Sequence, residues 1–533
     1  MHRQACTRVE RSSELVARPP EASHRVRIFS SRTTDRRSLT YSLARSLGVK
    51  CDIVEWCDSD VCSEVCARGT VDVPRWIDNA HRLQHRLSTT LPMCYANFFG
   101  THNSAITLAD GYGNQDPLFS GLLEYVEWIA PEATSRTIRT NDQYFSLTDQ
   151  LNMGVRMVEI DTHYVLGSLR VAHCGGLHVD ALDKLVEALN YVAKTLGYDV
   201  RWDTETVGCN PSLSSIPADY QRSFVDALLE IKSWMDDPRN GREFLIIYLD
   251  DEPDLLEWGV VPQLVDEIRR VFGDDAVFKP TDRDMHGREG AAGAAGPADW
   301  PPVASLVDRG FRAMFVSSSD YGPAMASHVF ARGLDVCDWR EPGLRELHAS
   351  TCELEGGFME GSLLRTPSCQ IQYGPLSCDF ALNNDNKPVL DEALLRNVVN
   401  CGLNVPAPDL LTPARAAAAV WTWAPGFPVE GGEGGCGDVV YVAASDGRWR
   451  TAGEGTSCED VWRLPLACRV DAPPSRPEWV LADDGACPAG TTAACPRHPR
   501  ENVALVSAIR ERREQAGGAL LVGARIRVDE LTS

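Results

Sequence analysis

Three short polar motifs in the first half of the chain each follow an apolar run: Thr101-His102-Asn103-Ser104, Glu159-Ile160-Asp161 and Ala172-His173-Cys174-Gly175. Imidazole groups have an ordinary pKa of ~6.5, so His102 and His173 could exchange protons with a substrate near neutral pH. Side chains alternate along a strand, so Glu159 and Asp161 share one face. Two carboxylates near the end of an apolar strand are costly unless they are paired, hydrated or bound to a metal. The motifs therefore predict an acid/base pair beside a carboxylate metal site.

The predicted metal ligands carry only oxygen. Asn103 adds a side-chain carbonyl to Glu159 and Asp161, and Asp250 adds a third carboxylate where the apolar run 244–249 ends. Such a set suits a hard cation, Ca²⁺ or Mg²⁺, better than zinc. We expect these residues to share one divalent ion.

Each of these residues also has an ordinary structural explanation. A single histidine in a loop is more often a surface or core residue than a catalyst. Glu159 could form one half of a buried ion pair with Arg156 or Arg170, and Asp250 could simply begin the turn before Pro253. These residues occur together, each at the end of a separate apolar run, and this favours a functional site over the structural explanations.

The elements that must position the motifs alternate between strands and helices. Apolar runs predict strands at 93–99, 154–161, 168–172, 244–249, 311–316 and 402–405, and helical spacing predicts helices at 76–87, 180–196, 224–234 and 264–272. This alternation favours a parallel α/β barrel or a doubly wound sheet. No G-x-G-x-x-G motif follows a strand, which disfavours dinucleotide binding. In a barrel, the motifs would all lie on the carboxyl-terminal face.

Composition divides the 533 residues into four parts. Residues 1–50 are rich in Arg and Ser and predict a leader or a disordered arm, without the apolar core of a signal peptide. A Cys-rich segment covers 51–92, the barrel covers 93–417, and a Cys- and Trp-rich, β-rich module covers 418–533, with a charged helix at 501–513. No apolar run is long enough to span a bilayer.

Charge and cysteine content limit the partners and the compartment. A formal charge of -23 argues against nucleic acid and against broad adhesion to anionic membranes. The 18 cysteines include no paired C-x-x-C motif, so disulfides are favoured over zinc sites. We expect a secreted protein or one of the endomembrane lumen.

The order of the motifs resembles the catalytic X region of phosphoinositide-specific phospholipase C. The resemblance rests on Thr101-His102-Asn103-Ser104, on Gln150-Leu151-x-x-Gly154-x-Arg156-x-x-Glu159-x-Asp161, and on Val171-Ala172-His173-Cys174-Gly175. It covers 93–254 well and the remainder to about 412 only as plausible barrel strands. It implies a TIM-type barrel with His102 and His173 as catalytic residues. It also implies Ca²⁺ held by Asn103, Glu159, Asp161 and Asp250, the last standing where calcium-dependent members usually have Glu.

The resemblance also implies a reaction. Calcium and a carboxylate would activate the inositol 2-hydroxyl to attack its own phosphodiester, releasing diacylglycerol and leaving an inositol phosphate. His102 would stabilise charge on phosphorus, and His173 would protonate the leaving oxygen. The lysines that family members use for ring phosphates are not identifiable, since Ser317-Ser318-Ser319 follows the run 311–316. We therefore expect phosphatidylinositol or a glycosyl-inositol lipid at a membrane surface.

Two other functions remain open. A glycerophosphodiesterase or sphingomyelinase-D-like barrel also uses two histidines and carboxylates around a divalent ion. The first motif of those enzymes is usually His-Arg-Gly or a similar sequence, whereas His102 is followed by Asn103-Ser104. A catalytically silent secreted binding or adhesion protein is the third. The module at 418–533 is weakly similar to a C-type-lectin-like domain, but it lacks the Glu-Pro-Asn signature and has Phe427-Pro428-Val429 instead. A structural role, in which disulfides stabilise the module, is favoured there over sugar binding.

Overall fold

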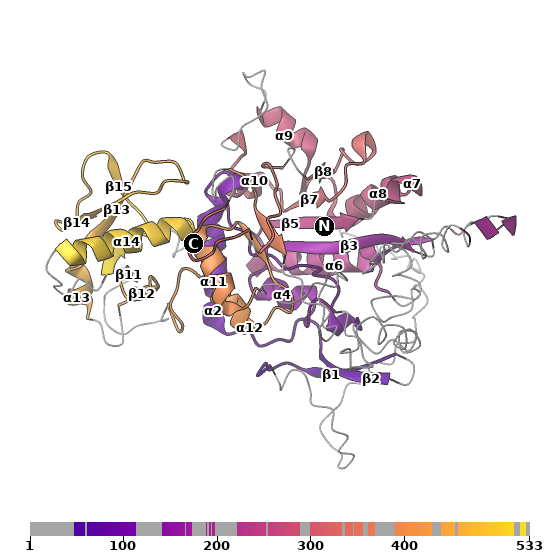
Figure 1. Cartoon of the computed structure of the whole chain (residues 1–533), viewed down its shortest axis with the longest axis horizontal. Helices are drawn as coiled ribbons and strands as arrows, with labels where there is room; N and C mark the ends of the chain where they lie inside the picture. The colour runs from indigo at the N-terminus through magenta and orange to yellow at the C-terminus, as the bar shows by residue number, and fades with distance from the viewer. Residues whose placement is uncertain are drawn as a thin grey trace, which may run out of the picture.

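The computed structural model in Figure 1 shows a mixed α/β protein. The structure describes residues 47–58, 61–112, 141–165, 167–172, 188, 191–192, 195–197, 221–251, 254–287, 299–332, 336–344, 346–354, 361–367, 390–428, 439–452, 457–515 and 523–528.

The central sheet is built from parallel strands. β3 (Met157–Val165) pairs with β5 (Leu245–Asp251), and β5 pairs with β7 (Ala313–Ser317). Two short strands, β6 (Val277–Phe278) and β8 (Val329–Ala331), both run parallel to β7. The strands predicted at 154–161, 244–249 and 311–316 are thus confirmed.

Further parallel hydrogen bonds extend this sheet beyond β3. Backbone N–H groups of Phe98 and Gly100 donate to carbonyls of residues 404 and 406 at 2.8 and 3.0 Å, and Gly100 also bridges to Met157. β10 (Val405–Ala407) pairs with β9 (Arg365–Pro367), next to a bridge between residues 340 and 364. Parallel pairs therefore connect β8, β7, β5, β3, the segment 98–100, β10 and β9. The closed TIM-type barrel remains a prediction.

Alternation along the strands separates two apolar cores. Val158 and Ile160 of β3 face one core, which includes the buried sides of the surrounding helices. Met157 faces a second core, with Tyr248 of β5 and Met314 of β7. Because Glu159 and Asp161 follow Met157 at every second position, they lie on the face of this second core.

Helices cover the outer face of the sheet (Figure 1). They are α2 (Arg75–Thr89), α6 (Phe224–Asp236), α8 (Val261–Phe272), α11 (Glu392–Cys401) and α12 (Pro413–Ala419). The hydroxyl of Ser223 caps α6 by accepting from the N–H of Asp226, which fixes the start of that helix. Helices predicted at 76–87, 224–234 and 264–272 are confirmed.

Three further predictions have different outcomes: the strand at 93–99 is wrong in part, the strand at 168–172 is confirmed, and the helix at 180–196 is largely undescribed. The run 93–99 begins as a 3₁₀ turn, η1 (Met93–Tyr95), because Pro92 starts the turn; only 98–100 pair as a strand. β4 (Ser168–Val171) runs antiparallel to β3 as the return of a hairpin. Most of the helix predicted at 180–196 lies outside the described residues.

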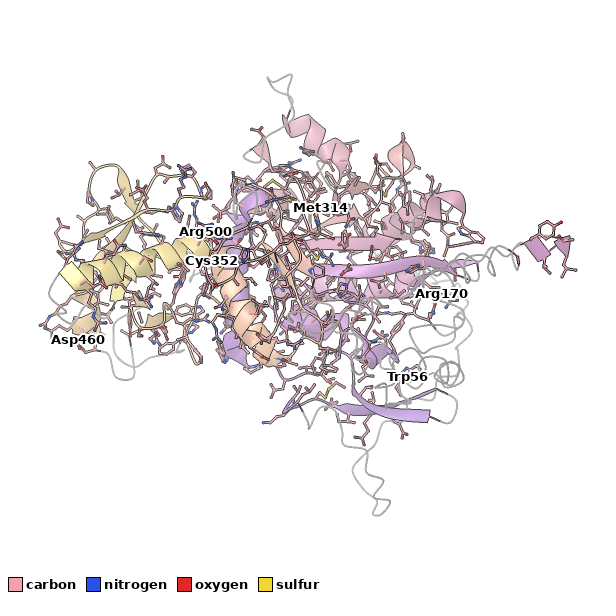
Figure 2. All side chains as sticks on the ribbon, in the orientation of Figure 1. Trp56, Arg170, Met314, Cys352, Asp460 and Arg500 are labelled. Carbon is pink, nitrogen blue, oxygen red and sulfur yellow. A yellow bond between two sulfur atoms is a disulfide. The ribbon has the colours of Figure 1, made fainter. Side chains whose placement is uncertain are left out.

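Cysteines in the described part of the chain form disulfides, as predicted. Four bridges lie among the described residues: Cys51–Cys66, Cys94–Cys337, Cys352–Cys401 and Cys468–Cys487. The first links the hairpin of β1 (Ile53–Asp58) and β2 (Val61–Cys66) to the preceding residues, and the third is marked by Cys352 in Figure 2. Such bridges are consistent with an oxidising compartment. No helix in the described part of the chain has both the length and the apolarity needed to cross a bilayer.

The carboxyl-terminal part forms a second sheet beside α11 (Figure 1). Its strand order is β12 (Trp449–Thr451), β11 (Val440–Ala443), β16 (Gly523–Ile526), β13 (Leu466–Val470) and β14 (Trp479–Ala482), with β15 (Thr491–Ala493) also on β13. A short helix, α13 (Cys458–Trp462), and the long α14 (Pro499–Gln515) complete it. The β-rich character and the charged helix predicted at 501–513 are confirmed.

Gly154 is required at the turn that precedes β3. Its φ is +99°, and a Cβ there would lie 2.1 Å from Cγ of the buried His81. Gly154→Ala should therefore lower the free energy of unfolding by about 3 kcal/mol, since it adds backbone strain to overpacking. Urea denaturation measures this loss. Gly259→Ala, where φ is +70° and no atom lies within 4 Å, is the control for backbone strain alone and should cost less. Equal losses would show that the His81 contact is unimportant.

Candidate functional site

Polar side chains gather toward the carboxyl ends of the parallel strands, with Glu159 within β3 and Arg365 as the first residue of the short β9. They are His102 after segment 98–100, Glu159 and Asp161 on β3, Asp250 on β5, Glu341 after the bridge at residue 340, Arg365 on β9 and Asp409 after β10. The carboxyl ends of parallel strands are where α/β enzymes place their chemistry. Segments distant in sequence therefore contribute to one site.

The turn that carries His102 is anchored from both ends. The hydroxyl of Thr101 donates to Gln150 at 2.7 Å, and the Gln150 amide donates to the Ser104 carbonyl at 2.8 Å. The Ser104 hydroxyl accepts from the backbone N–H of Glu159 at 2.8 Å. These buried bonds hold the 101–104 turn against β3. They explain why the motif surrounds its histidine with Thr and Ser.

His102 is paired with a buried aspartate. Its Nδ1 lies 2.7 Å from Oδ1 of Asp409, and the side chain of His102 is 15% exposed while that of Asp409 is fully buried. Burial alone would lower the pKa of His102, but attraction to Asp409, Glu159 and Asp142 outweighs it and raises the pKa to about 10. His102 is thus an imidazolium at neutral pH. A cation at this place stabilises negative charge and does not act as a base.

Asn103 adopts a left-handed backbone conformation, with φ of +42°. Its backbone N–H donates to Oε2 of Glu159 at 2.8 Å, and its side-chain amide donates to Asp142 at 2.9 Å. Asparagine tolerates this conformation better than most residues. The turn therefore places the backbone N–H of Asn103 against Glu159 and its side chain against Asp142.

Glu159 does form a buried ion pair, but with a partner that the sequence did not indicate. Arg365 of β9 contacts Oε2 of Glu159, and both side chains are almost fully buried. Of the two predicted partners, Arg156 pairs with Glu243 at 2.7 Å. Arg170 donates to Ser168 and to the carbonyl of Gln221, and Figure 2 shows it near the outer end of β3.

Asp161 and Asp250 lie opposite each other in the register of β3 and β5. Asp161 is buried, whereas Asp250 is exposed to solvent. Desolvation by the surrounding protein, followed by repulsion from Glu159, raises the pKa of Asp250 above its usual range, although Arg365 and His102 oppose the shift. Crowded carboxylates of this kind favour an added positive charge.

The predicted donor set contains only oxygen ligands, which suit a hard divalent ion, but the ligand atoms of Glu159, Asp161 and Asp250 do not all lie within 4.8 Å of one another, as those of the group described below do. The hydrogen bonds described above use Oε2 of Glu159 and Nδ2 of Asn103. Among the described residues, none reaches the other oxygen of Glu159, Oε1, or the side-chain carbonyl Oδ1 of Asn103. Asp161 and Asp250 contribute further oxygens on the same face of the sheet. That Asn103, Glu159, Asp161 and Asp250 bind calcium together remains a prediction. Arg365 already neutralises part of this charge.

A second group could also hold a metal. Ligand atoms of His102, Asp142 and Asp409 all lie within 4.8 Å of one another. However, Nδ1 of His102 already bonds to Asp409, and the pair would have to give up a proton to accept an ion. An ion pair therefore explains this group better than a metal does.

His173, the second predicted catalytic histidine, lies outside the described residues. The chain reaches it through Ala172, whose backbone N–H donates to the carbonyl of Asp161 at 3.2 Å. Its role stays a prediction.

The sequence did not point to Asp409, Asp142, Arg365 or Glu341. Asp409 follows β10 by two residues, so the rule that led to Asp250 could have found it. Arg365 lies in a strand of three residues that carries no periodic pattern. Asp142 lies in a loop. No sequence signal marks either of these two.

The His102 pair makes stability depend on pH. The pKa is about 10 in the folded protein and ~6.5 when unfolded, so the stabilisation is complete below pH ~6.5 and is lost as pH rises to about 10. The difference in unfolding free energy between wild type and His102→Gln should shrink by about 1.4 kcal/mol per pH unit in that window. Denaturation at a series of pH values measures it. A constant difference would show that folding leaves the pKa of His102 unchanged.

Comparison with known proteins gives distant similarities. No family model matches the chain. Uncharacterized protein MT2135 of Mycobacterium tuberculosis (strain CDC 1551 / Oshkosh) is 24% identical over 449 residues, which cover 79% of this chain and 73% of that protein. Uncharacterized protein Rv2075c of strain ATCC 25618 / H37Rv gives the same values.

Two solved structures are also similar. Both are of a calcium-dependent phosphoinositol-specific phospholipase C from a Gram-negative bacterium, Pseudomonas sp.. The apo form, myoinositol complex, is 16% identical with a TM-score of 0.31, covering 62% of this chain and 94% of that one. The second crystal form is 15% identical with a TM-score of 0.30, covering 62% and 93%. The chain is thus distantly similar to a phospholipase C of known structure.

Proposed function

We propose that this protein is a phosphoric diester hydrolase of the phospholipase C type that cleaves phosphatidylinositol or a glycosyl-inositol lipid. The observation that carries the proposal is the His102–Asp409 pair, 2.7 Å apart, on the strand ends that also hold Glu159, Asp161 and Asp250. The order of sequence motifs supports it independently. We further propose that the protein acts at a lipid surface in an oxidising, extracellular or lumenal compartment, as its disulfides support.

His102 would act on the phosphoryl group. As the 2-hydroxyl of inositol attacks phosphorus, negative charge grows on the phosphoryl oxygens, and the His102 imidazolium donates a hydrogen bond to them from Nε2. Asp409 holds Nδ1 and so fixes the direction in which Nε2 points. The pair is held by the protein before substrate arrives, so it needs little reorganisation during the reaction.

The remaining steps involve the carboxylates and His173. Asn103, Glu159, Asp161 and Asp250 would hold a calcium ion, which would lower the pKa of the attacking hydroxyl and neutralise phosphate charge. A nearby carboxylate would accept the hydroxyl proton. The new bond joins the 2-oxygen to phosphorus, the bond from phosphorus to the glycerol oxygen breaks, and His173 gives that oxygen a proton. Water would then open the cyclic phosphodiester to an inositol phosphate.

Headgroup analysis tests this proposal. Purified protein is incubated with vesicles of phosphatidylinositol, phosphatidylcholine or sphingomyelin, and with glycerophosphodiesters, in calcium or in chelator. We expect an inositol phosphate that requires calcium and is lost in His173→Ala. The exposed His348, replaced by Ala, serves as control. Release of choline or glycerol would instead indicate a sphingomyelinase-D-like enzyme or a glycerophosphodiesterase. If the folded protein cleaves none of these substrates, a binding or adhesion function is the one that remains.

A further inference from the structure

Arg365 is a buried cation inside the predicted metal site. Its side chain is 3% exposed, and its two terminal nitrogens contact Glu159 and Glu341, the latter at 2.8 Å. Its guanidinium carbon lies 4.7 Å from the ring centroid of Tyr248. Three contacts from three separate segments, β3, β5 and the residue after the bridge at 340, therefore fix its position.

The partners of Arg365 are themselves anchored. Glu341 accepts from Nε1 of Trp339 at 3.1 Å and pairs with Arg332 at 3.0 Å. Tyr248 stacks on Trp339 with ring centroids 5.3 Å apart, and its hydroxyl accepts from Arg332 at 2.8 Å. Arg365 therefore cannot swing away from Glu159 without breaking a packed network. Its positive charge stays beside the carboxylates whether or not a metal is present.

We propose that Arg365 is a positioning residue that competes with the divalent cation for Glu159, and so keeps the carboxylate cluster folded without metal and weakens metal binding. This inference rests on the proposed function in one respect, because the cation site is that of the proposed phosphodiesterase. A cation at Glu159 must share that carboxylate with Arg365 and remain close to a like charge. Binding therefore releases less free energy than it would with Glu159 unpaired.

The chain contains a matched control at the opposite ends of the same strands. Arg156 is equally buried, pairs with Glu243 at 2.7 Å and lies 5.0 Å from the ring centroid of Trp234. Arg156 is therefore buried, paired with a carboxylate and in contact with an aromatic ring, as Arg365 is, but it lies outside the candidate site. Arg332 is a second control, because it is a cation near the site that pairs with Glu341 and not with Glu159.

The experiment measures calcium binding by calorimetry and the thermal unfolding midpoint in chelator and in calcium. Arg365→Met keeps the length of the side chain and removes its charge. It should lower the midpoint in chelator, because the carboxylates lose their counter-charge. Calcium should then raise the midpoint more than it does for wild type. The calcium Kd should be tighter than that of wild type by about tenfold or more.

The controls separate competition from simpler effects. Arg156→Met should lower the midpoint in both buffers without changing calcium affinity. Arg332→Met, which removes a charge that does not touch Glu159, should change the Kd by less than about threefold. Arg365→Gln is also neutral but keeps a hydrogen-bond donor, so it carries the same expectation as Arg365→Met if the latter does not fold.

An unchanged calcium Kd in a folded neutral Arg365 variant would overturn the inference. An equal gain in calcium affinity in Arg332→Met would also overturn it. The loss of any nearby positive charge would then explain the gain, without direct competition for Glu159. These readouts need no substrate. If phosphatidylinositol is not cleaved, the proposed function fails while the competition between Arg365 and calcium is still measured.

Discussion

Replacing His102 by Gln is expected to lower the rate of phosphatidylinositol cleavage by about 10³-fold. Glutamine is close in size and can still donate a hydrogen bond, but it carries no charge. The imidazolium is present at neutral pH because Asp409, Glu159 and Asp142 raise the pKa of His102 to about 10 against the effect of burial. The loss should appear in kcat more than in KM, since charge on the phosphoryl oxygens grows only in the transition state.

A second histidine–aspartate pair provides the control for this substitution. Nε2 of His328 lies 2.8 Å from Asp274, and His328 precedes β8 at the amino end of the sheet. His328→Gln removes a similar pair outside the site and should leave the rate unchanged. If His102→Gln retained the rate of wild type, or if both variants lost it equally, the assignment of His102 would be wrong.

The double substitution Asp161→Asn with Asp250→Asn is expected to abolish the calcium dependence of activity and to lower the rate by about 10²-fold or more. Asparagine keeps one oxygen at each position but removes both charges, which a hard cation needs. Initial rates across a calcium titration measure the effect. Asp237→Asn is the control, because Asp237 lies between α6 and the turn η5 (Pro238–Asn240), which it caps.

The same carboxylates should cost stability in the absence of a cation. The raised pKa of Asp250 means that its ionised form is disfavoured in the folded protein, first by desolvation and then by Glu159. Folding stability contributed by Asp250 is therefore lost as pH rises through its ordinary range. Asp250→Asn should raise the unfolding midpoint in chelator at neutral pH.

A calcium response of the Asp161→Asn, Asp250→Asn double variant equal to that of wild type would contradict this account of the site.

The sequence allowed the strand-borne part of the site to be predicted, because the strand period determines which side chains share a face. Glu159, Asp161 and Asp250 lie within two long strands of mostly apolar residues, and the register of β3 and β5 places the two aspartates opposite each other. His102 was predicted because it follows a strand in a compact polar motif. The parallel packing of these strands then brings the residues to one edge.

The remaining part of the site depends on tertiary contacts that no local pattern encodes. Arg365 reaches Glu159 across 206 residues of sequence, and Asp409 reaches His102 across 307. Arg365 is the first residue of β9 and Asp409 follows β10, and these strands of only three residues are too short to show alternation. The run at 93–99 was assigned wrongly for a related reason, because Pro92 favours a turn that composition alone does not reveal.

We propose that residues at the carboxyl ends of the parallel strands catalyse the intramolecular cleavage of an inositol phospholipid. Phosphorus NMR of phosphatidylinositol incubated with the purified protein and calcium tests it most directly. We predict that the diester signal is replaced by that of a cyclic inositol phosphodiester, with diacylglycerol as the other product, and that His102→Gln prevents this change. Formation of phosphatidic acid with free inositol, or an unchanged diester signal with folded wild-type protein, would contradict it.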